Sequence, residues 1–277
     1  MFEFLFWFLL AGLIIASFQD FKRREVDYWL NYLLIAGSAG FILFYAIFNS
    51  DYLILLQGIF AFAIFLLLGN LFYYARIYGG GDAWVLIALS SFFIGSGFIQ
   101  TLQNQGIFIL LSFFIGSIWG LIFAFFVFFK NFSKCTKHLK EQVRKGYFKL
   151  GFLIGIVFLI FSYINIIFLS FSILIFLAIF LWAFSKSVEN SSMTKFMHVS
   201  EVRQGDYLAK EIRFKGKVIK ADWEGISLKD LNFLKSKKFK GKISVRDGVP
   251  YVPSFLITLI IYWLFKSEIF SFLANLF

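Results

Sequence analysis

Cysteine is almost absent from this sequence: Cys135 is the single cysteine among 277 residues. One thiol cannot form an internal disulfide, and it cannot supply the cysteine pairs of a zinc site. His138 lies three positions further on, but two ligands do not make a zinc site. The sequence also has no P-loop, no Gly-x-Ser-x-Gly and no His-Glu-x-x-His pattern. Nucleotide-binding, serine-hydrolase and zinc-protease functions therefore have no support.

Apolar residues, by contrast, are abundant. They make up 60% of the chain, and the mean hydropathy of +0.80 is typical of a membrane protein. The net charge is +11, but Lys and Arg usually mark the cytoplasmic loops of such proteins, so we expect no nucleic-acid partner. The first apolar run has neither a basic region before it nor a small-residue cleavage site, which predicts a retained span rather than a signal peptide.

The apolar runs set the number of expected spans, since crossing a bilayer takes roughly 20 residues. Five runs lie at residues 2–18, 29–48, 53–75, 83–102 and 106–129. The run 150–184 would be about 52 Å long as one helix, against a core of about 30 Å, so it predicts a hairpin that turns near Tyr163, Ile164 and Asn165. A last span at 252–265 brings the expected total to about eight.

Composition divides the chain into five segments. We expect a membrane core with five helices (1–130), a basic cytoplasmic loop (131–149), a transmembrane hairpin (150–185), a small cytoplasmic α+β domain (186–250), and a last helix with its tail (251–277). The expected fold class is an all-α polytopic membrane protein that carries this small domain.

Short β patterns and one helix signal describe the small domain. Strands are expected at Ile212–Phe214, Val218–Ile219 and Ile243–Val245, and Asp247-Gly248 suggests a tight turn. Ser227 reads as the N-cap of a helix that continues to about Lys238. The basic stretch from Lys235 to Lys242 is expected to be a solvated surface, with binding of anionic lipid headgroups as the alternative.

The basic residues also predict an orientation. With the N-terminus outside, every Lys and Arg except Lys266 falls on the inner side, as the positive-inside rule requires. We therefore expect a multi-pass protein of the cytoplasmic membrane, with its soluble domain in the cytoplasm.

Acidic residues in or beside a membrane are costly, so each one needs an explanation. Glu3, Asp51 and Glu268 fall in outer loops or termini, where solvation explains them. Surface pairing explains Glu25 and Asp27, which adjoin a basic cluster.

Two acids remain, Asp20 and Asp82. Asp20 follows the first apolar run, and Asp82 follows Gly79, Gly80 and Gly81 at the start of the fourth. Spans two and three return the chain to the same face, so the two carboxylates could meet. The glycines would permit positive φ and close backbone approach, giving an extended peptide room beside the loop. The alternative is that Asp82 merely caps a helix and that Asp20 is an interfacial acid.

These residues resemble a known pattern. Gly79-x-Gly81-Asp82 resembles the GxGD motif of membrane aspartyl proteases. Asp20-Phe21-Lys22-Arg23-Arg24-Glu25-Val26 resembles the Asp-x-Lys-x-Arg-x-Val pattern of archaeal type IV prepilin and preflagellin peptidases. The segment 248–256 resembles the junction between that family's soluble domain and its last helix. Bacterial relatives carry Ile-Pro-Asn and paired CxxC motifs, which are missing here, so the resemblance does not extend to N-methyltransferase activity. Members of that family have six transmembrane helices, so six is the minimum number of spans expected here.

The resemblance implies an aspartic endopeptidase that uses Asp20 and Asp82 and needs no metal or organic cofactor. Its substrate would be a prepilin-like or preflagellin-like precursor with a short basic leader ahead of a hydrophobic helix, cut at the cytoplasmic face. One alternative is a proton- or cation-coupled transporter with both acids as a relay, which predicts acids near the bilayer midplane. Another is a non-catalytic assembly protein.

Overall fold

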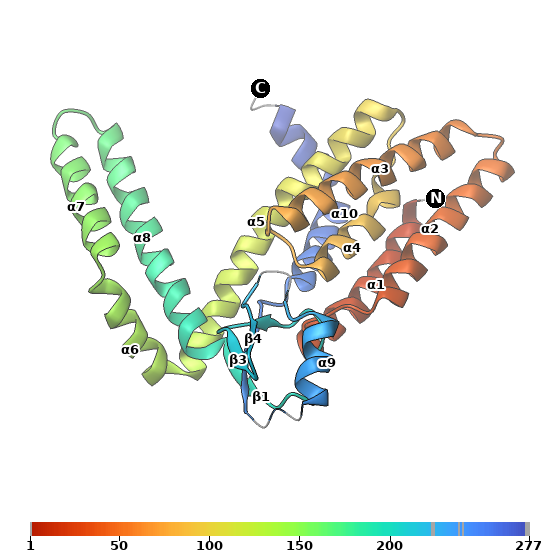
Figure 1. Cartoon of the computed structure of the whole chain (residues 1–277). Coiled ribbons are helices and arrows are strands. Elements are labelled where there is room, and N and C mark those ends of the chain that lie inside the picture. Colours follow the sequence, from red (N-terminus) through yellow and green to blue (C-terminus); the bar gives the residue numbers. More distant parts are fainter. Residues whose placement is uncertain (1, 223–224, 238, 240, 275–277) are drawn as a thin grey trace. The chain divides into compact units, whose positions relative to one another are not determined.

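The computed structural model describes residues 2–222, 225–237, 239 and 241–274 (Figure 1). The chain forms two compact units. The first combines Met1–Leu121 with Val249–Phe277, and the second is Ile122–Gly248.

The first unit is a helical bundle. Its elements are α1 (Phe2–Arg23), α2 (Tyr28–Phe48), α3 (Leu53–Tyr74), α4 (Gly80–Ala88), the 3₁₀ helix η1 (Ser90–Phe93), the start of α5 (Phe98–Lys130), and α10 (Val252–Ala274). Leu5, Leu9 and Leu13 recur every four residues on α1 and are fully buried in the core that α1 shares with α10. Trp7 and Phe18 stay exposed on the same helix. A helix that is apolar on both its buried and its exposed faces suits a lipid environment.

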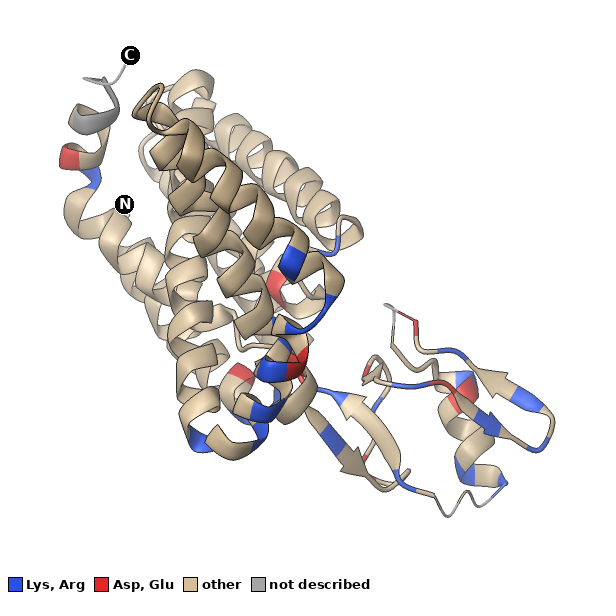
Figure 2. Cartoon of the chain, turned by 90° about the vertical axis from the view of Figure 1, so that its left-hand side faces the viewer, with Lys and Arg blue, Asp and Glu red and all other residues tan. Residues whose placement is uncertain are grey.

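Six helices among the described residues are long and apolar enough to cross a membrane. They are Glu3–Arg23, Tyr28–Phe48, Leu53–Tyr74, Phe98–Lys130, Ile167–Ser192 and Val252–Ser271. Few charged residues interrupt these long helices (Figure 2). The chain is thus a multi-pass membrane protein with a small α+β domain, which confirms the predicted fold class. Six is fewer than the eight spans expected and equals the expected minimum.

The predicted span at 83–102 is wrong. The chain leaves α4 at Ala88, passes through η1, and enters α5 at Phe98. Two polar side chains in the first turn of α5 bind the preceding loop: Gly95 N–H donates to Thr101 Oγ1 at 3.0 Å, and Ser96 N–H donates to Gln100 Oε1 at 2.6 Å. These bonds satisfy backbone groups outside any helix, so the loop can end one helix and start the next within an apolar stretch.

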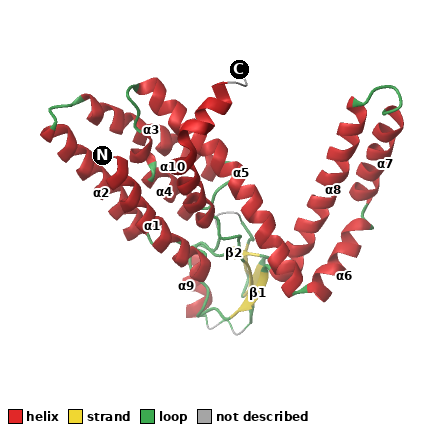
Figure 3. Cartoon of the chain, turned by 180° about the vertical axis from the view of Figure 1, so that it is seen from behind, coloured by secondary structure: helices red, strands yellow, loops and turns green. Residues whose placement is uncertain are grey.

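Three helices follow in the second unit: α6 (Phe132–Val143), α7 (Gly146–Phe161) and α8 (Ile167–Ser192). The long pair α7 and α8 packs side by side (Figure 3). Ser172 of α8 donates a hydrogen bond to the Gly155 carbonyl of α7 at 2.8 Å. The turn lies at 162–166, where the sequence favours one, and α7 is shorter than a full span at 16 residues. Residues 131–149, expected as a loop, contain α6.

The small domain consists of a three-stranded sheet, a two-stranded sheet and one helix. Its elements are β1 (Thr194–Met197), β2 (Tyr207–Leu208), β3 (Ile212–Phe214), β4 (Lys217–Ile219), α9 (Leu228–Ser236) and β5 (Ile243–Arg246). The antiparallel order is β1-β5-β2 in one sheet and β3-β4 in the other. Lys215 and Gly216 join β3 to β4 with positive φ at both positions, as a two-residue hairpin loop requires.

The three predicted strands are confirmed as β3, β4 and β5, and β1 and β2 are additional. Ser227 caps α9 as predicted, accepting the Asp230 N–H at 3.1 Å. Helix α9 ends at Ser236, and Lys238, the expected end, lies outside the described residues. The tight turn predicted at Asp247-Gly248 is wrong, because Asp247 N–H donates to the Met193 carbonyl at 2.7 Å and prolongs the β1–β5 pairing.

Candidate functional site

Asp20 lies in the last turn of α1 and is 5% exposed. Its Oδ2 accepts the backbone N–H of Val252, the first residue of α10, at 3.0 Å. The first N–H groups of a helix have no partner within the helix, and they carry partial positive charge that favours a carboxylate. Asp20 therefore joins the end of one helix to the start of another that is 232 residues away in the sequence.

Asp82 lies in the first turn of α4 and is partly exposed. The Gly79 N–H donates to Asp82 Oδ2 at 3.1 Å, so the side chain bonds back to the N-cap residue of its own helix. The alternative made Asp82 the N-cap residue, but Gly79 holds that position, and Asp82 bonds to it from the third helical position, as in a capping box. Only one of its oxygens takes part in that bond. The cap therefore leaves the second carboxylate oxygen available for chemistry.

The glycines before Asp82 do not adopt left-handed backbone. Gly79 has φ −69° and ψ 162°, and the positive φ values found among described glycines belong to positions 205, 216 and 225. The expectation of positive φ in this loop is therefore wrong. A Cβ added to Gly81 would lie 3.5 Å from the backbone nitrogen of Val26. Gly80 and Gly81, expected in a loop, lie in the first turn of α4, and this turn lies beside the segment that follows α1.

The contact at Val26 brings the two sequence motifs together. Gly81 lies beside the backbone of Val26, and burial, followed by the charge of Asp20, raises the pKa of Asp82 to about 7. Both carboxylates lie at helix ends, Asp20 at the end of α1 and Asp82 at the start of α4. Such a pair can offer one carboxylate as a base and one carboxyl as an acid at the same place.

Two tyrosines beside the motifs were missed by sequence reasoning. Tyr78 directly precedes the glycine run, and its ring centroid lies 5.1 Å from that of Tyr251. Tyr251 donates its hydroxyl to the Ser112 carbonyl at 2.9 Å. Burial raises the pKa of both phenols. The Pro250-Tyr251-Val252-Pro253 stretch, at the junction before the last helix, could have drawn attention to Tyr251. No sequence feature marks Ser112 as its partner.

The remaining acids behave as the sequence suggests. Glu3, Asp51 and Glu268 are exposed, and Glu3 and Glu268 lie near the ends of helices long enough to cross a membrane. Asp27 Oδ2 accepts from Arg23 at 2.5 Å and from the Trp29 ring N–H at 3.3 Å, which confirms surface pairing for this residue. These acids therefore need no catalytic explanation.

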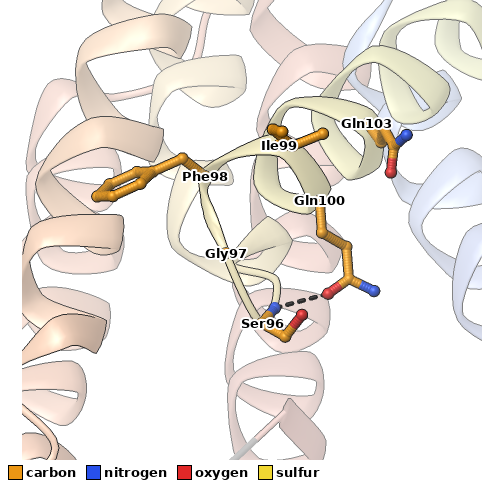
Figure 4. Close-up of a pocket in the computed structure, with 6 residues that line it drawn as sticks. All are labelled: Ser96, Gly97, Phe98, Ile99, Gln100 and Gln103. Carbon is orange, nitrogen blue, oxygen red and sulfur yellow. Dashed lines mark hydrogen bonds between the residues drawn. The ribbon is translucent and has the colours of Figure 1, made fainter.

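A surface hollow of about 470 Å³ lies elsewhere, at the loop before α5 (Figure 4). Its lining residues are Ser96, Gly97, Phe98, Ile99, Gln100 and Gln103. It contains neither acid and no titratable side chain, so it supplies no acid–base chemistry.

Comparison of the sequence with known protein families gives a match that contains both acidic motifs. Residues 7–125 match the type IV leader peptidase family. The match includes Asp20, the glycine run and Asp82, and it confirms the resemblance inferred from the motifs. It covers less than half of the chain, and residues 126–277 lie beyond it.

Two curated relatives share the same function name. A "Preflagellin peptidase" of Methanococcus maripaludis is 30% identical over 128 residues, which cover 43% of this chain and 55% of the relative. A "Preflagellin peptidase" of Methanococcus voltae is 31% identical over 147 residues, covering 48% of this chain and 61% of the relative. The chain thus spans little more than half the length of these relatives. No solved structure matches it significantly.

Proposed function

We propose that this chain is a membrane aspartyl endopeptidase that removes the short basic leader of prepilin-like or preflagellin-like precursors. The observation that carries the proposal is the backbone contact of Gly81 with Val26, which unites the motifs of Asp20 and Asp82. The leader-peptidase match over residues 7–125 supports the same reading. The glycines predicted to support the site are Gly79, the N-cap of α4, and Gly80 and Gly81 in its first turn.

The proposed chemistry uses one shared proton. Two carboxylates held close cannot both ionise cheaply, so one is ionised and the other protonated. The ionised carboxylate takes a proton from water, whose oxygen attacks the scissile carbonyl carbon, while the protonated carboxyl donates to the carbonyl oxygen. As the diol collapses and the C–N bond breaks, one carboxyl proton passes to the leaving amine, and the ionised carboxylate takes a hydroxyl proton from the diol, which restores the shared proton. Every proton in this cycle comes from the dyad or the water.

The proposed cut is on the cytoplasmic side. The basic residues of the membrane domain cluster beside Asp20, at Lys22, Arg23 and Arg24, and the positive-inside rule places such clusters in the cytoplasm. We propose that the N-terminus is outside and that the small domain is cytoplasmic. The precursor's own hydrophobic helix would then reach the site from within the bilayer.

Membrane vesicles test both the substrate class and the side of the membrane on which cleavage occurs. Everted vesicles that contain the chain are expected to cut an added, membrane-impermeant precursor peptide between its basic leader and its hydrophobic segment. Right-side-out vesicles should leave the same peptide whole, because both carboxylates face the lumen. A peptide whose leader lysines are replaced by glutamine serves as the substrate control. Equal cleavage by both vesicle types would contradict the orientation, and cleavage by neither would contradict the function.

A matched pair of glycine variants tests the turn around Asp82. A Cβ at Gly79 would lie 3.2 Å from Asp82 Oδ2, tighter than an ordinary contact, whereas a Cβ at Gly80 would meet only the Tyr73 ring at 3.7 Å. Gly79→Ala should therefore displace the carboxyl and lower kcat about tenfold, because small misplacements of catalytic groups are costly. Gly80→Ala should keep wild-type activity. Kinetics of both purified variants check this, and equal rates would show that the turn does not position Asp82.

A further inference from the structure

The Pro250–Val252 segment, which leads into α10, is held by α5 through two long-range hydrogen bonds. Tyr251 donates its hydroxyl to the Ser112 carbonyl at 2.9 Å, and the Trp119 ring N–H donates to the Pro250 carbonyl at 2.7 Å. The bonded residues are 139 and 131 positions apart in the sequence. Two directed bonds to a rigid helix fix both the position and the rotation of this short segment.

Gly116 lies between these two bonds and makes room for the phenol. A Cβ at this position would lie 2.2 Å from Tyr251 Oη and 2.5 Å from its Cζ, far inside contact distance. The tyrosine could avoid such a methyl group only by leaving its bond to Ser112. Gly120, one turn further along α5, has nothing within 4 Å of an added Cβ. The close approach is thus specific to Gly116.

The held segment touches both catalytic motifs. Val252 N–H donates to Asp20 Oδ2 at 3.0 Å. On the other side, the ring of Tyr78, which leads into the Gly79–Asp82 turn, packs on Tyr251 at 5.1 Å and on Phe255 at 5.5 Å. One short stretch of chain therefore contacts the Asp20 side and the Asp82 side of the site.

We propose that Tyr251 is a positioning residue that couples the two halves of the dyad. Its hydroxyl, seated over Gly116 and bonded to Ser112, fixes the start of α10. The fixed Val252 N–H holds Asp20, while the ring holds Tyr78. This inference rests on the proposed protease function, and it assigns the last helix a role in catalysis in addition to its role in the fold.

Two glycine variants of α5 test the coupling in the full-length protein. Gly116→Ala is expected to lower kcat for a leader-bearing precursor about 10- to 100-fold, the range expected when catalytic groups move by up to 1 Å. KM should stay within about twofold, because the lost interaction acts on the reacting groups and not on substrate binding. Gly120→Ala should match wild type in both constants. Equal effects of the two variants, or a change in KM alone, would overturn the proposal.

A conservative change at the tyrosine separates coupling from general packing. Tyr251→Phe keeps the ring on Tyr78 but loses the bond to Ser112, so its kcat should fall less than that of Gly116→Ala. Since Gly116→Ala acts through the same side chain, the double variant should be no worse than Gly116→Ala alone. Additive losses would show that Gly116 does not act through Tyr251.

Hydrogen exchange gives a second measurement that needs no activity. The peptide containing Val252 should exchange about tenfold faster in Gly116→Ala and in Asp20→Ala than in wild type or Gly120→Ala, because its N–H loses a fixed acceptor. Unchanged exchange in Gly116→Ala would overturn the coupling. If wild type left the precursor whole, the protease function would fail, and the exchange result would still decide the coupling.

Discussion

Asparagine at Asp20 or at Asp82 is expected to reduce precursor cleavage by about 10⁴-fold or more, the scale seen when one member of a catalytic unit is removed. An amide can neither take a proton from water nor donate one to a carbonyl as a carboxyl does. The change is nearly isosteric and removes a costly charge, so folding should survive. Initial rates of the two purified variants, together with their thermal unfolding, measure both effects.

Asparagine also separates catalysis from helix capping at Asp82. The Gly79 N–H bonds to one Asp82 oxygen at 3.1 Å, and an asparagine oxygen accepts about as well at a helix N-terminus. A capping role alone would therefore leave activity intact. Asp51→Asn, at an exposed acid away from both motifs, is the matched control and should keep the wild-type rate. The double variant should be no slower than either single variant, because the two carboxylates act as a unit.

Cleavage should depend on pH in a bell-shaped manner. Below the optimum the dyad gains a second proton, and no carboxylate remains to activate water. Above the optimum the shared proton is lost, and nothing donates to the carbonyl oxygen. Each limb should fall about tenfold per pH unit, and the two apparent pKa values belong to the pair and not to either residue.

The profile is measured as kcat/KM over the range in which the protein stays folded, with circular dichroism as the control. A single limb would mean that one group titrates alone, and that outcome is incompatible with a shared proton. A profile that is flat across the folded range would exclude acid–base catalysis by the dyad.

The sequence singles out Asp20 and Asp82 through local signals. Both are acids at the ends of apolar runs, and the even number of expected spans between them predicts that they share one face. The three strands and the Ser227 cap were likewise readable from short patterns. In each case the decisive information lies within a few residues.

The contacts between distant segments could not be read in this way. The bonds from Val252 to Asp20 and from Tyr251 to Ser112 join residues more than 130 positions apart, and no local pattern encodes them. The break between α4 and α5 was missed because side chains such as Thr101 satisfy the loop's backbone inside an apolar run. The approach of Gly81 to Val26 was missed for a related reason: it joins segments that the sequence does not place side by side.

The most direct test of the central claim is mass spectrometry of a leader-bearing precursor incubated side by side with wild type and with folded Asp82→Asn protein. The account predicts that wild type yields two products, separated at the end of the basic leader, whose masses add up to the precursor plus one water. It predicts that the variant leaves the precursor whole over the same time. Cleavage at the same bond by Asp82→Asn at a near wild-type rate would contradict it.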